Sequence, residues 1–281
     1  MNRKLIPILL SCLGAVAVPI TAAPAFFAMD TGTRDAAHQT AQSQMALVKE
    51  LGFDGIGPTY TSAAALREML TEADRQQSKV FAVYESLKLD EPQPLSARIQ
   101  DAIGQLRGRD AILWLTVMHK GIPPSDPAGD AVAVEVLQQI ARLAGTAKVK
   151  VALYPHAGSW LERSEDAVRL AKAVNHKHLG VTFNLCHWLK VDGKDLEARL
   201  KEAMPYLMVV TVNGADAGAR DWGKLIQPLD SGDFDIGQLL AILKNLDYQG
   251  PFGLQHFGIR GDVRANLQRS MAAWRKLQQA P

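Results

Sequence analysis

Cysteine is scarce in this chain of 281 residues, which has only Cys12 and Cys186. Cys12 lies in an apolar N-terminal segment, so removal of that segment would leave one thiol and exclude an intrachain disulfide. The chain also lacks an excess of either charge, because it has 31 basic and 29 acidic side chains. That balance gives no electrostatic footprint for nucleic acid or an anionic membrane. We therefore expect a domain held by its own core, with neither of these as a partner.

The N-terminal segment has the three-part layout of a secretory signal peptide. Residues 2–4 are Asn-Arg-Lys, residues 5–20 are almost wholly apolar, and small residues follow. The apolar run is short for a membrane span, and no later run is long enough for one. We predict a signal peptide over 1–23, export to the periplasm or medium, and one domain over 24–281. Lipid anchoring at Cys12 is the alternative.

Short apolar runs alternate with helix-period stretches along the rest of the chain. The predicted strands are 25–30, 53–57, 79–86, 111–118, 148–155, 179–185, 207–213 and 251–256. The predicted helices are 35–51, 62–77, 95–107, 131–145, 164–175, 195–204, 236–246 and 262–277. Eight strand–helix units in about 250 residues predict an α/β fold, a single-domain (β/α)8 TIM barrel. The rival, an open doubly wound sheet, usually has a Gly-rich phosphate loop after its first strand, and none is present.

A TIM barrel builds its active site at the carboxyl ends of its strands. The polar side chains at or just after the predicted ends are Asp30, Glu85, His119, His156, Asn184, His187, Asn213, Asp216, Gln255 and His256. Four of the seven histidines belong to this set. Each alone is as readily explained by a structural role. Together they predict imidazoles that converge on the barrel mouth.

The segment VKVALYPHAGSWLERSEDAVRLAKAVNHKHLGVTFNLCHWLKVDG (149–193) resembles the centre of the xylose isomerase-like TIM barrels. That superfamily contains sugar isomerases and epimerases and a DNA-repair endonuclease branch. KELGFDGIG (49–57), IQPLDSGDFD (226–235) and YQGPFGLQ (248–255) resemble further parts of it. The resemblance covers most of the predicted domain. It implies the barrel fold and an activity on sugars.

The resemblance also implies a divalent metal site made of a Glu, an Asp, a His and a second Glu on strands five to eight. Tyr154, Asn184, Asn213 and Gln255 stand at those four places. Mg²⁺ and Mn²⁺ prefer anionic oxygen ligands, and three negative charges are missing here. We therefore assign no metal ligand. A divalent Zn²⁺ or Mn²⁺ ion among the mouth histidines stays open, although no HxH or HExxH pattern supports it.

We expect proton transfer next to a carbonyl group, with His156, His187, Lys190 and Glu85 as the catalytic residues. The predicted substrate-binding residues are Tyr154, His119, Asn184, Asn213, Asp216, Gln255, His256 and Trp188. His156, His187 and Lys190 match positions that flank the metal site in the family. Export and the lack of a Gly-rich phosphate cradle favour a non-phosphorylated sugar as the small-molecule partner.

Three interpretations remain open from the sequence. The favoured one is an exported isomerase, epimerase or lyase-type enzyme with a histidine-rich centre. The second is a catalytically inactive barrel that binds a saccharide or a protein. The third is an ordinary metal-dependent isomerase whose ligands are assigned wrongly above. The sequence determines neither the sugar nor the oligomeric state.

Overall fold

The structure is a computed structural model that describes residues 23–279. The predicted signal peptide lies outside the described residues, apart from Ala23, and so does Cys12. Across the described range no helix is both long and apolar enough to cross a bilayer.

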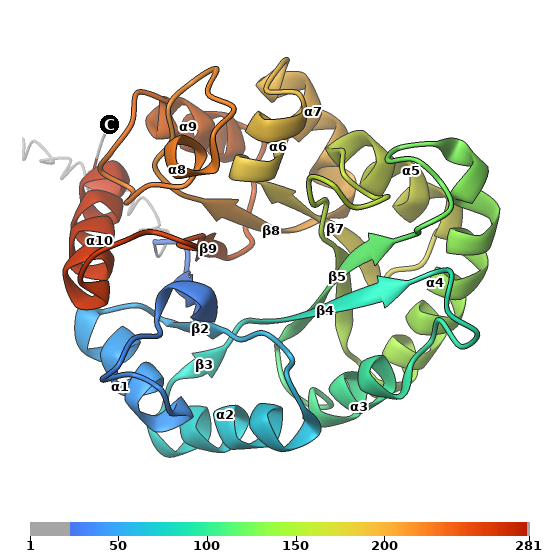
Figure 1. The fold of residues 1–281 in the computed structure, drawn as a ribbon, viewed down its shortest axis with the longest axis horizontal. Helices are drawn as coiled ribbons and strands as arrows, with labels where there is room; N and C mark the ends of the chain where they lie inside the picture. Colours follow the sequence, from blue (N-terminus) through green and yellow to red (C-terminus); the bar gives the residue numbers. More distant parts are fainter. Residues whose placement is uncertain (1–22, 280–281) are drawn as a thin grey trace, which may run out of the picture.

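Within residues 23–279, nine parallel strands form one sheet in the order β3-β2-β1-β9-β8-β7-β6-β5-β4. Their bounds are β1 Phe26–Met29, β2 Gly55–Gly57, β3 Lys79–Val80, β4 Ala82–Lys88, β5 Ile112–Met118, β6 Lys150–Leu153, β7 Leu179–Asn184, β8 Leu207–Val212 and β9 Phe252–Leu254. β3 and β4 are two halves of one predicted strand, interrupted at Phe81. A parallel bridge between Thr59 and Tyr84 joins the two ends of the sheet. The prediction of a TIM barrel is confirmed, and Figure 1 shows the strands surrounded by a ring of helices.

The helices follow the strands in the predicted order. Their bounds are α1 Ala41–Leu51, α2 Ala63–Arg75, α3 Ala97–Gln105, α4 Asp130–Ala147, α5 Ser164–Val174, α6 Leu185–Val191, α7 Leu196–Ala203, α8 Trp222–Leu225, α9 Ile236–Asn245 and α10 Val263–Gln279. The short α6 and α8 were not predicted. α6 begins directly after β7, so part of the stretch interpreted as a strand end is the first turn of a helix. This matters because α6 carries one of the mouth histidines.

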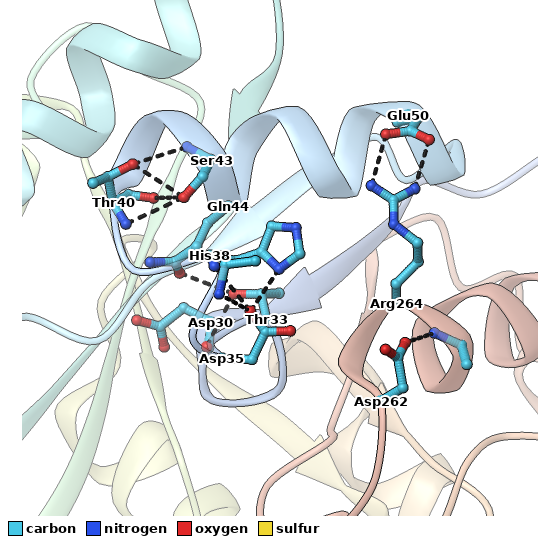
Figure 2. Close-up of polar contacts among 12 residues, drawn as sticks. Asp30, Thr33, Asp35, His38, Thr40, Ser43, Gln44, Glu50, Asp262 and Arg264 are labelled. Carbon is cyan, nitrogen blue, oxygen red and sulfur yellow. Dashed lines mark hydrogen bonds and ion pairs between the residues drawn. The ribbon is translucent and has the colours of Figure 1, made fainter.

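Capping and packing fix the first and last helices. Thr40 and Ser43 exchange side-chain-to-backbone hydrogen bonds in a capping box at the start of α1, which ends at Gly52 with φ 88°. Figure 2 shows this cap and the ion pair in which Arg264 of α10 contacts both carboxylate oxygens of Glu50 on α1. α10 therefore packs beside α1, which places the last helix of the ring next to the first.

Side chains of each strand alternate between the barrel interior and the helix layer. Inside, Phe27 stacks on Phe81 with ring centroids 5.0 Å apart and lies 5.7 Å from Trp114. Outside, Phe26 stacks on Trp274 of α10 at 4.2 Å. The interior aromatic residues fill the barrel below the carboxyl ends of the strands. The mouth consequently has an aromatic floor.

The amino-terminal end of the barrel has a hollow of its own, about 470 Å³ in volume. Ala25, directly before β1, lies on its wall, together with Lys79 and Lys150. Both lysines contact Asp110, at 2.8 and 3.8 Å. This hollow lies at the opposite end from the mouth, because it is lined by the residues at which the strands begin.

Candidate functional site

The floor of the mouth is formed by Tyr154 and Gln255. Tyr154 directly follows β6, is only 1% exposed and lies 5.2 Å from the Trp114 ring. Nε2 of Gln255 donates to its hydroxyl at 3.3 Å. Oε1 of Gln255 accepts hydrogen bonds from the backbone N–H groups of His256 and Phe257 at 2.9 and 3.0 Å, and these bonds fix the orientation of the amide. Burial raises the pKa of Tyr154 well above 10, so its hydroxyl stays protonated at neutral pH.

Two histidines meet above this floor. His156 lies two residues after Tyr154, and His187 lies in the first turn of α6. Their ring centroids are 4.0 Å apart, and His187 also contacts Tyr154 edge-on at 5.9 Å. His187 is buried, whereas His156 is partly exposed. The structure therefore brings together three of the predicted site residues from β6 and β7.

The backbone of Ala157 orients both rings. Its N–H donates to Nδ1 of His187 at 3.2 Å, so the proton of neutral His187 lies on Nε2. Its carbonyl oxygen lies 3.1 Å from Nδ1 of His156, so that nitrogen carries the proton and Nε2 of His156 keeps a lone pair. One ring thus has a donor Nε2–H and the other an acceptor Nε2. These tautomers are assigned from the hydrogen bonds.

Burial keeps the pair neutral. It lowers the pKa of His156 below its usual 6.5, and it lowers the pKa of His187 well below that value. The neighbouring His156 lowers the pKa of His187 further, because two adjacent cations would repel each other. At neutral pH both rings are therefore uncharged, and the site can take up a proton at His156.

Lys190 and Trp222 form the rim beside the pair. Nζ of Lys190 lies 5.2 Å from the centre of the Trp222 ring, and Trp222 contacts His187 edge-on at 5.4 Å. Nζ also donates to the backbone carbonyl of Arg220. Trp222 is 39% exposed, so part of its ring is accessible to solvent at the edge of the mouth. Lys190 is thereby tied to the rim and lies near the pair.

Glu85, predicted as catalytic, does not join the pair. Its neighbour Tyr84 packs inside the barrel, so Glu85 points from β4 to the helix layer. There its carboxylate accepts Nε–H of Arg98 on α3 at 2.8 Å. The prediction went wrong because successive side chains of β4 point to opposite faces. When a strand is buried on both faces, its sequence does not show which residues point into the barrel and which point to the helix layer.

The expected convergence of four imidazoles is also incorrect. His256 follows the inward-facing Gln255 by one residue and therefore points outward, where its Nε2 lies 3.1 Å from Oγ of Ser270 on α10. His119 lies in the loop after β5, and its Nδ1 accepts the Gly121 N–H at 3.1 Å. The cluster is reduced to the pair of His156 and His187.

The remaining predicted binding residues are held by the fold. Trp188 packs against Phe183 and Phe234 in the helix layer. Nδ2 of Asn213 donates to the backbone carbonyls of Gly214 and Leu225. A carboxylate oxygen of Asp216 accepts a hydrogen bond from Nε2 of Gln227 at 2.8 Å. Each of the three side chains is therefore held by contacts within the protein.

Asp30 is a mouth carboxylate that the predicted site omitted. It ends the β1 segment, is 1% exposed, and accepts the Thr59 hydroxyl at 2.9 Å. It also pairs with Arg34, whose side chain is 47% exposed. Figure 2 shows the loop of Asp30 beside α1. Its position directly after an apolar strand was the available signal.

The residues at the family's metal positions do not fit a hard cation. Oδ1 of Asn184 is bonded to the Thr211 hydroxyl, and Oε1 of Gln255 is bonded to two backbone N–H groups. In the described part of the chain, only Oδ1 of Asn213 is a buried amide oxygen without a partner. Residues 23–279 also contain no group of three or more His, Cys, Asp or Glu side chains arranged around an ion. The donor set is neutral and largely occupied by internal bonds.

A family model for the xylose isomerase-like TIM barrel matches residues 45–277. The chain belongs to this family. A search of curated proteins finds no match. The resemblance stated from the sequence is therefore confirmed at the level of the family.

Solved structures of xylose isomerase-like barrels superpose over nearly the whole chain. An IolI protein with a bound zinc atom aligns with TM-score 0.74 and 16% identity, over 90% of this chain and 97% of its own. The 3-keto-D-glucoside 4-epimerase from E. coli aligns with 0.72 and 15%, over 90% and 99%. A D-allulose 3-epimerase from Methylomonas sp. in complex with D-allulose aligns with 0.73 and 13%, over 90% and 96%. Identities this low establish the common fold alone.

Proposed function

We propose that the protein is an enzyme of the sugar isomerase or epimerase type that moves a proton at the carbon next to a carbonyl group. The observation that carries the proposal is the pair of neutral imidazoles, which the Ala157 backbone holds in opposite tautomers. Enolisation needs a base for the C–H proton and a donor for the developing oxyanion. Nε2 of His156 and Nε2–H of His187 have these properties.

In the proposed step, Nε2 of His156 takes the proton from the carbon next to the carbonyl. The electron pair of that C–H bond forms the enolate, whose oxygen accepts a hydrogen bond from His187. His156 then returns the proton to the neighbouring carbon while a hydroxyl proton moves to the former carbonyl oxygen, which completes an isomerisation. If the enolate turns over in the mouth before His156 returns its proton, the proton reaches the other face of the original carbon, which gives an epimerisation. Only protons move between positions, so no oxidant is required.

The mouth suits a non-phosphorylated keto sugar. The Tyr154 hydroxyl and the rim at Lys190 and Trp222 offer polar contacts and one aromatic face for a sugar ring. The names of two structural neighbours contain a keto sugar, which supports this substrate class. Lys190 donates to the Arg220 carbonyl and Arg34 pairs with Asp30, so both cations are already bound by groups of the protein.

The test is deuterium exchange in D₂O, followed by NMR on a panel of D-fructose, D-allulose, D-tagatose and D-galacturonate. Exchange at the carbon next to the carbonyl reports enolisation without knowledge of the product. The wild type should exchange at least one of these sugars. His156→Ala should lower the rate by about 10²–10⁴-fold, as expected for loss of a general base.

His176→Ala is the matched control, because His176 lies in the loop before β7 at the opposite end of the barrel. It should exchange at the wild-type rate. Binding of a panel sugar with no exchange by the wild type would contradict the enzyme proposal. That outcome would support the inactive saccharide-binding barrel instead.

Metal analysis separates the proposal from a metal-dependent isomerase. Protein purified without chelator, then dialysed against EDTA, should keep its exchange rate. Stoichiometric Zn²⁺, Mn²⁺ or Mg²⁺, together with loss of exchange on chelation and its recovery on adding the ion, would show that an ion among the mouth residues does the chemistry.

Export is part of the proposal. It is supported by the basic start and apolar run of residues 2–20. Mass spectrometry of the protein recovered from the periplasm or medium should show an N-terminus within residues 22–26. A protein that keeps Met1 in the cytoplasmic fraction would contradict it, and a diacylglyceryl group on Cys12 would show anchoring.

A further inference from the structure

A second hollow lies beside the loop that carries His156. It has a volume of about 460 Å³ and lies between the loop after β5 and the loop after β6. Residues 118–124 form one wall and residues 158–160 form the other. Its volume is within the range of about 300–1,000 Å³ that small-molecule sites occupy. None of the groups assigned to proton transfer lies in it, so it has no role in the proposed step.

The hollow and the catalytic histidine share one tight turn. The N–H of Ser159, on the wall, donates to the carbonyl of His156 at 2.9 Å, and the N–H of His156 donates to the carbonyl of Leu161 at 3.0 Å. The N–H of Ser125 donates to the carbonyl of Trp160 at 2.8 Å, which joins the two loops. Backbone hydrogen bonds therefore tie one wall of the hollow to His156 and the two loops to each other.

The lining has the mixed character that a sugar ring requires. Met118 is 38% exposed and, with the prolines at 123 and 124, provides apolar contact for C–H groups. His119 and Ser159 provide polar atoms for hydroxyl groups. Nδ1 of His119 accepts a hydrogen bond from the Gly121 N–H, so Nε2 is the ring nitrogen that carries a proton and can donate. Lys120 also lines the hollow, and its ammonium group can donate to hydroxyl groups. Apolar contact combined with these donors matches a sugar ring with hydroxyls better than a lipid.

We propose that this hollow binds a second sugar unit, so that the substrate is a glycosylated keto sugar and not a free monosaccharide. The inference rests on the proposed function for the position of the reacting unit. The keto unit occupies the mouth at His156 and His187, and its glycosyl substituent lies between the β5 and β6 loops. The contribution of the hollow is to bind and position the substrate, and the proton step is unchanged.

The experiment compares D-fructose with its glucosyl derivatives turanose, maltulose and isomaltulose, which carry glucose at different oxygens. Deuterium exchange gives kcat/KM for each sugar, and saturation-transfer NMR titration gives Kd. At least one disaccharide should exceed D-fructose in kcat/KM by about tenfold or more, which corresponds to about 1.4 kcal/mol. Equal values for D-fructose and all three disaccharides would overturn the inference.

Gly121 lines the hollow, so Gly121→Phe places a large side chain at its wall. A Cβ at Gly121 would lie 3.5 Å from the His119 ring, an ordinary contact. The disaccharide kcat/KM should fall at least about tenfold more than the D-fructose value. Gly104→Phe is the matched control, because Gly104 is exposed on α3 with nothing within 4 Å of its added Cβ. It should leave both values unchanged. An equal fall for both sugars in Gly121→Phe would contradict a separate subsite.

The two proposals can fail independently. Exchange of D-fructose without any advantage for the disaccharides supports the enzyme and contradicts the second subsite. Tighter binding of a disaccharide, lost in Gly121→Phe and accompanied by no exchange of any sugar, supports the subsite and contradicts the enzyme.

Discussion

The histidines at the ends of β6 and β9 are a natural comparison, because they look alike in the sequence and serve different parts of the structure. His156 faces the interior and is set by the Ala157 carbonyl, so its second nitrogen is left at the mouth. His256 faces outward, and its ring is bonded to Ser270 on α10. Burial lowers the pKa of both. The end of a strand therefore fixes the position of a residue along the barrel axis. The alternation of side chains along the strand determines whether that residue points into the barrel or toward the helix layer.

Among variants that test this difference between inward and outward histidines, the largest expected effect is a loss of turnover when a histidine at the mouth is removed. His187→Ala removes the proposed oxyanion donor and should lower the exchange rate by about 10²–10³-fold, the usual cost of losing one such donor. His187→Gln keeps an N–H group and should recover part of the rate. Full activity in folded His187→Ala would break the comparison, because the inward ring would then be as dispensable for chemistry as the outward one. Urea unfolding should be measured on each variant.

The next effect is the acid stability that His256 contributes. Its pKa falls from 6.5 to about 4 on folding, so the unfolded chain binds the proton more readily. The stabilising contribution is complete above pH 6.5, declines as the pH falls toward 4, and is lost below that value. The linkage amounts to about 3 kcal/mol. The stability difference between wild type and His256→Gln should therefore narrow by about that amount between pH 7 and pH 4, as measured by urea unfolding. A constant difference would contradict a buried neutral ring.

A somewhat smaller effect is expected when His256 is truncated at neutral pH. His256→Ala removes a buried ring and leaves the Ser270 hydroxyl without one partner, at a cost of about 2–3 kcal/mol in the free energy of unfolding. The exchange rate per folded molecule should stay near that of the wild type. A loss of turnover as large as that of His187→Ala would place this ring in the chemistry.

The smallest effect concerns Glu85. Glu85→Gln removes the charge opposite Arg98, whose side chain is 49% exposed, so solvent screening limits the cost to about 1 kcal/mol. Thermal unfolding measures this change. Exchange should persist, because the carboxylate lies in the helix layer. Loss of exchange without loss of fold would restore Glu85 to the catalytic group.

The barrel itself could be predicted from the sequence, since eight apolar runs separated by helix-period stretches admit few other closed arrangements. The pairing of His156 with His187 was predictable as well, because β6 and β7 are consecutive and adjacent in the sheet. The direction of Glu85 and His256 was not. In strands covered on both faces, inner and outer positions are equally apolar, so composition does not mark them.

The alternation that sequence composition hides is nevertheless regular. Leu254 at the end of β9 packs outward, and after it Gln255 points inward and His256 points outward again. Ala152 of β6 packs inside the barrel, and after the strand Tyr154 and His156 continue on that side. If one inward-facing residue were known in each strand, the alternation would assign every other side chain of that strand either to the barrel interior or to the helix layer. The amides at Asn184 and Gln255 could be identified from the sequence, but not the internal bonds that occupy their oxygens.

Ala25 enters β1 beside the hollow at the amino-terminal end, and the mouth with His156 and His187 lies at the other end. Any fusion partner, affinity tag or solid support joined ahead of β1 is therefore attached on the side away from the mouth. Immobilisation through that end orients the molecule with His156 and His187 toward the bulk solution, whereas coupling through Lys190 on the rim would obstruct access to them.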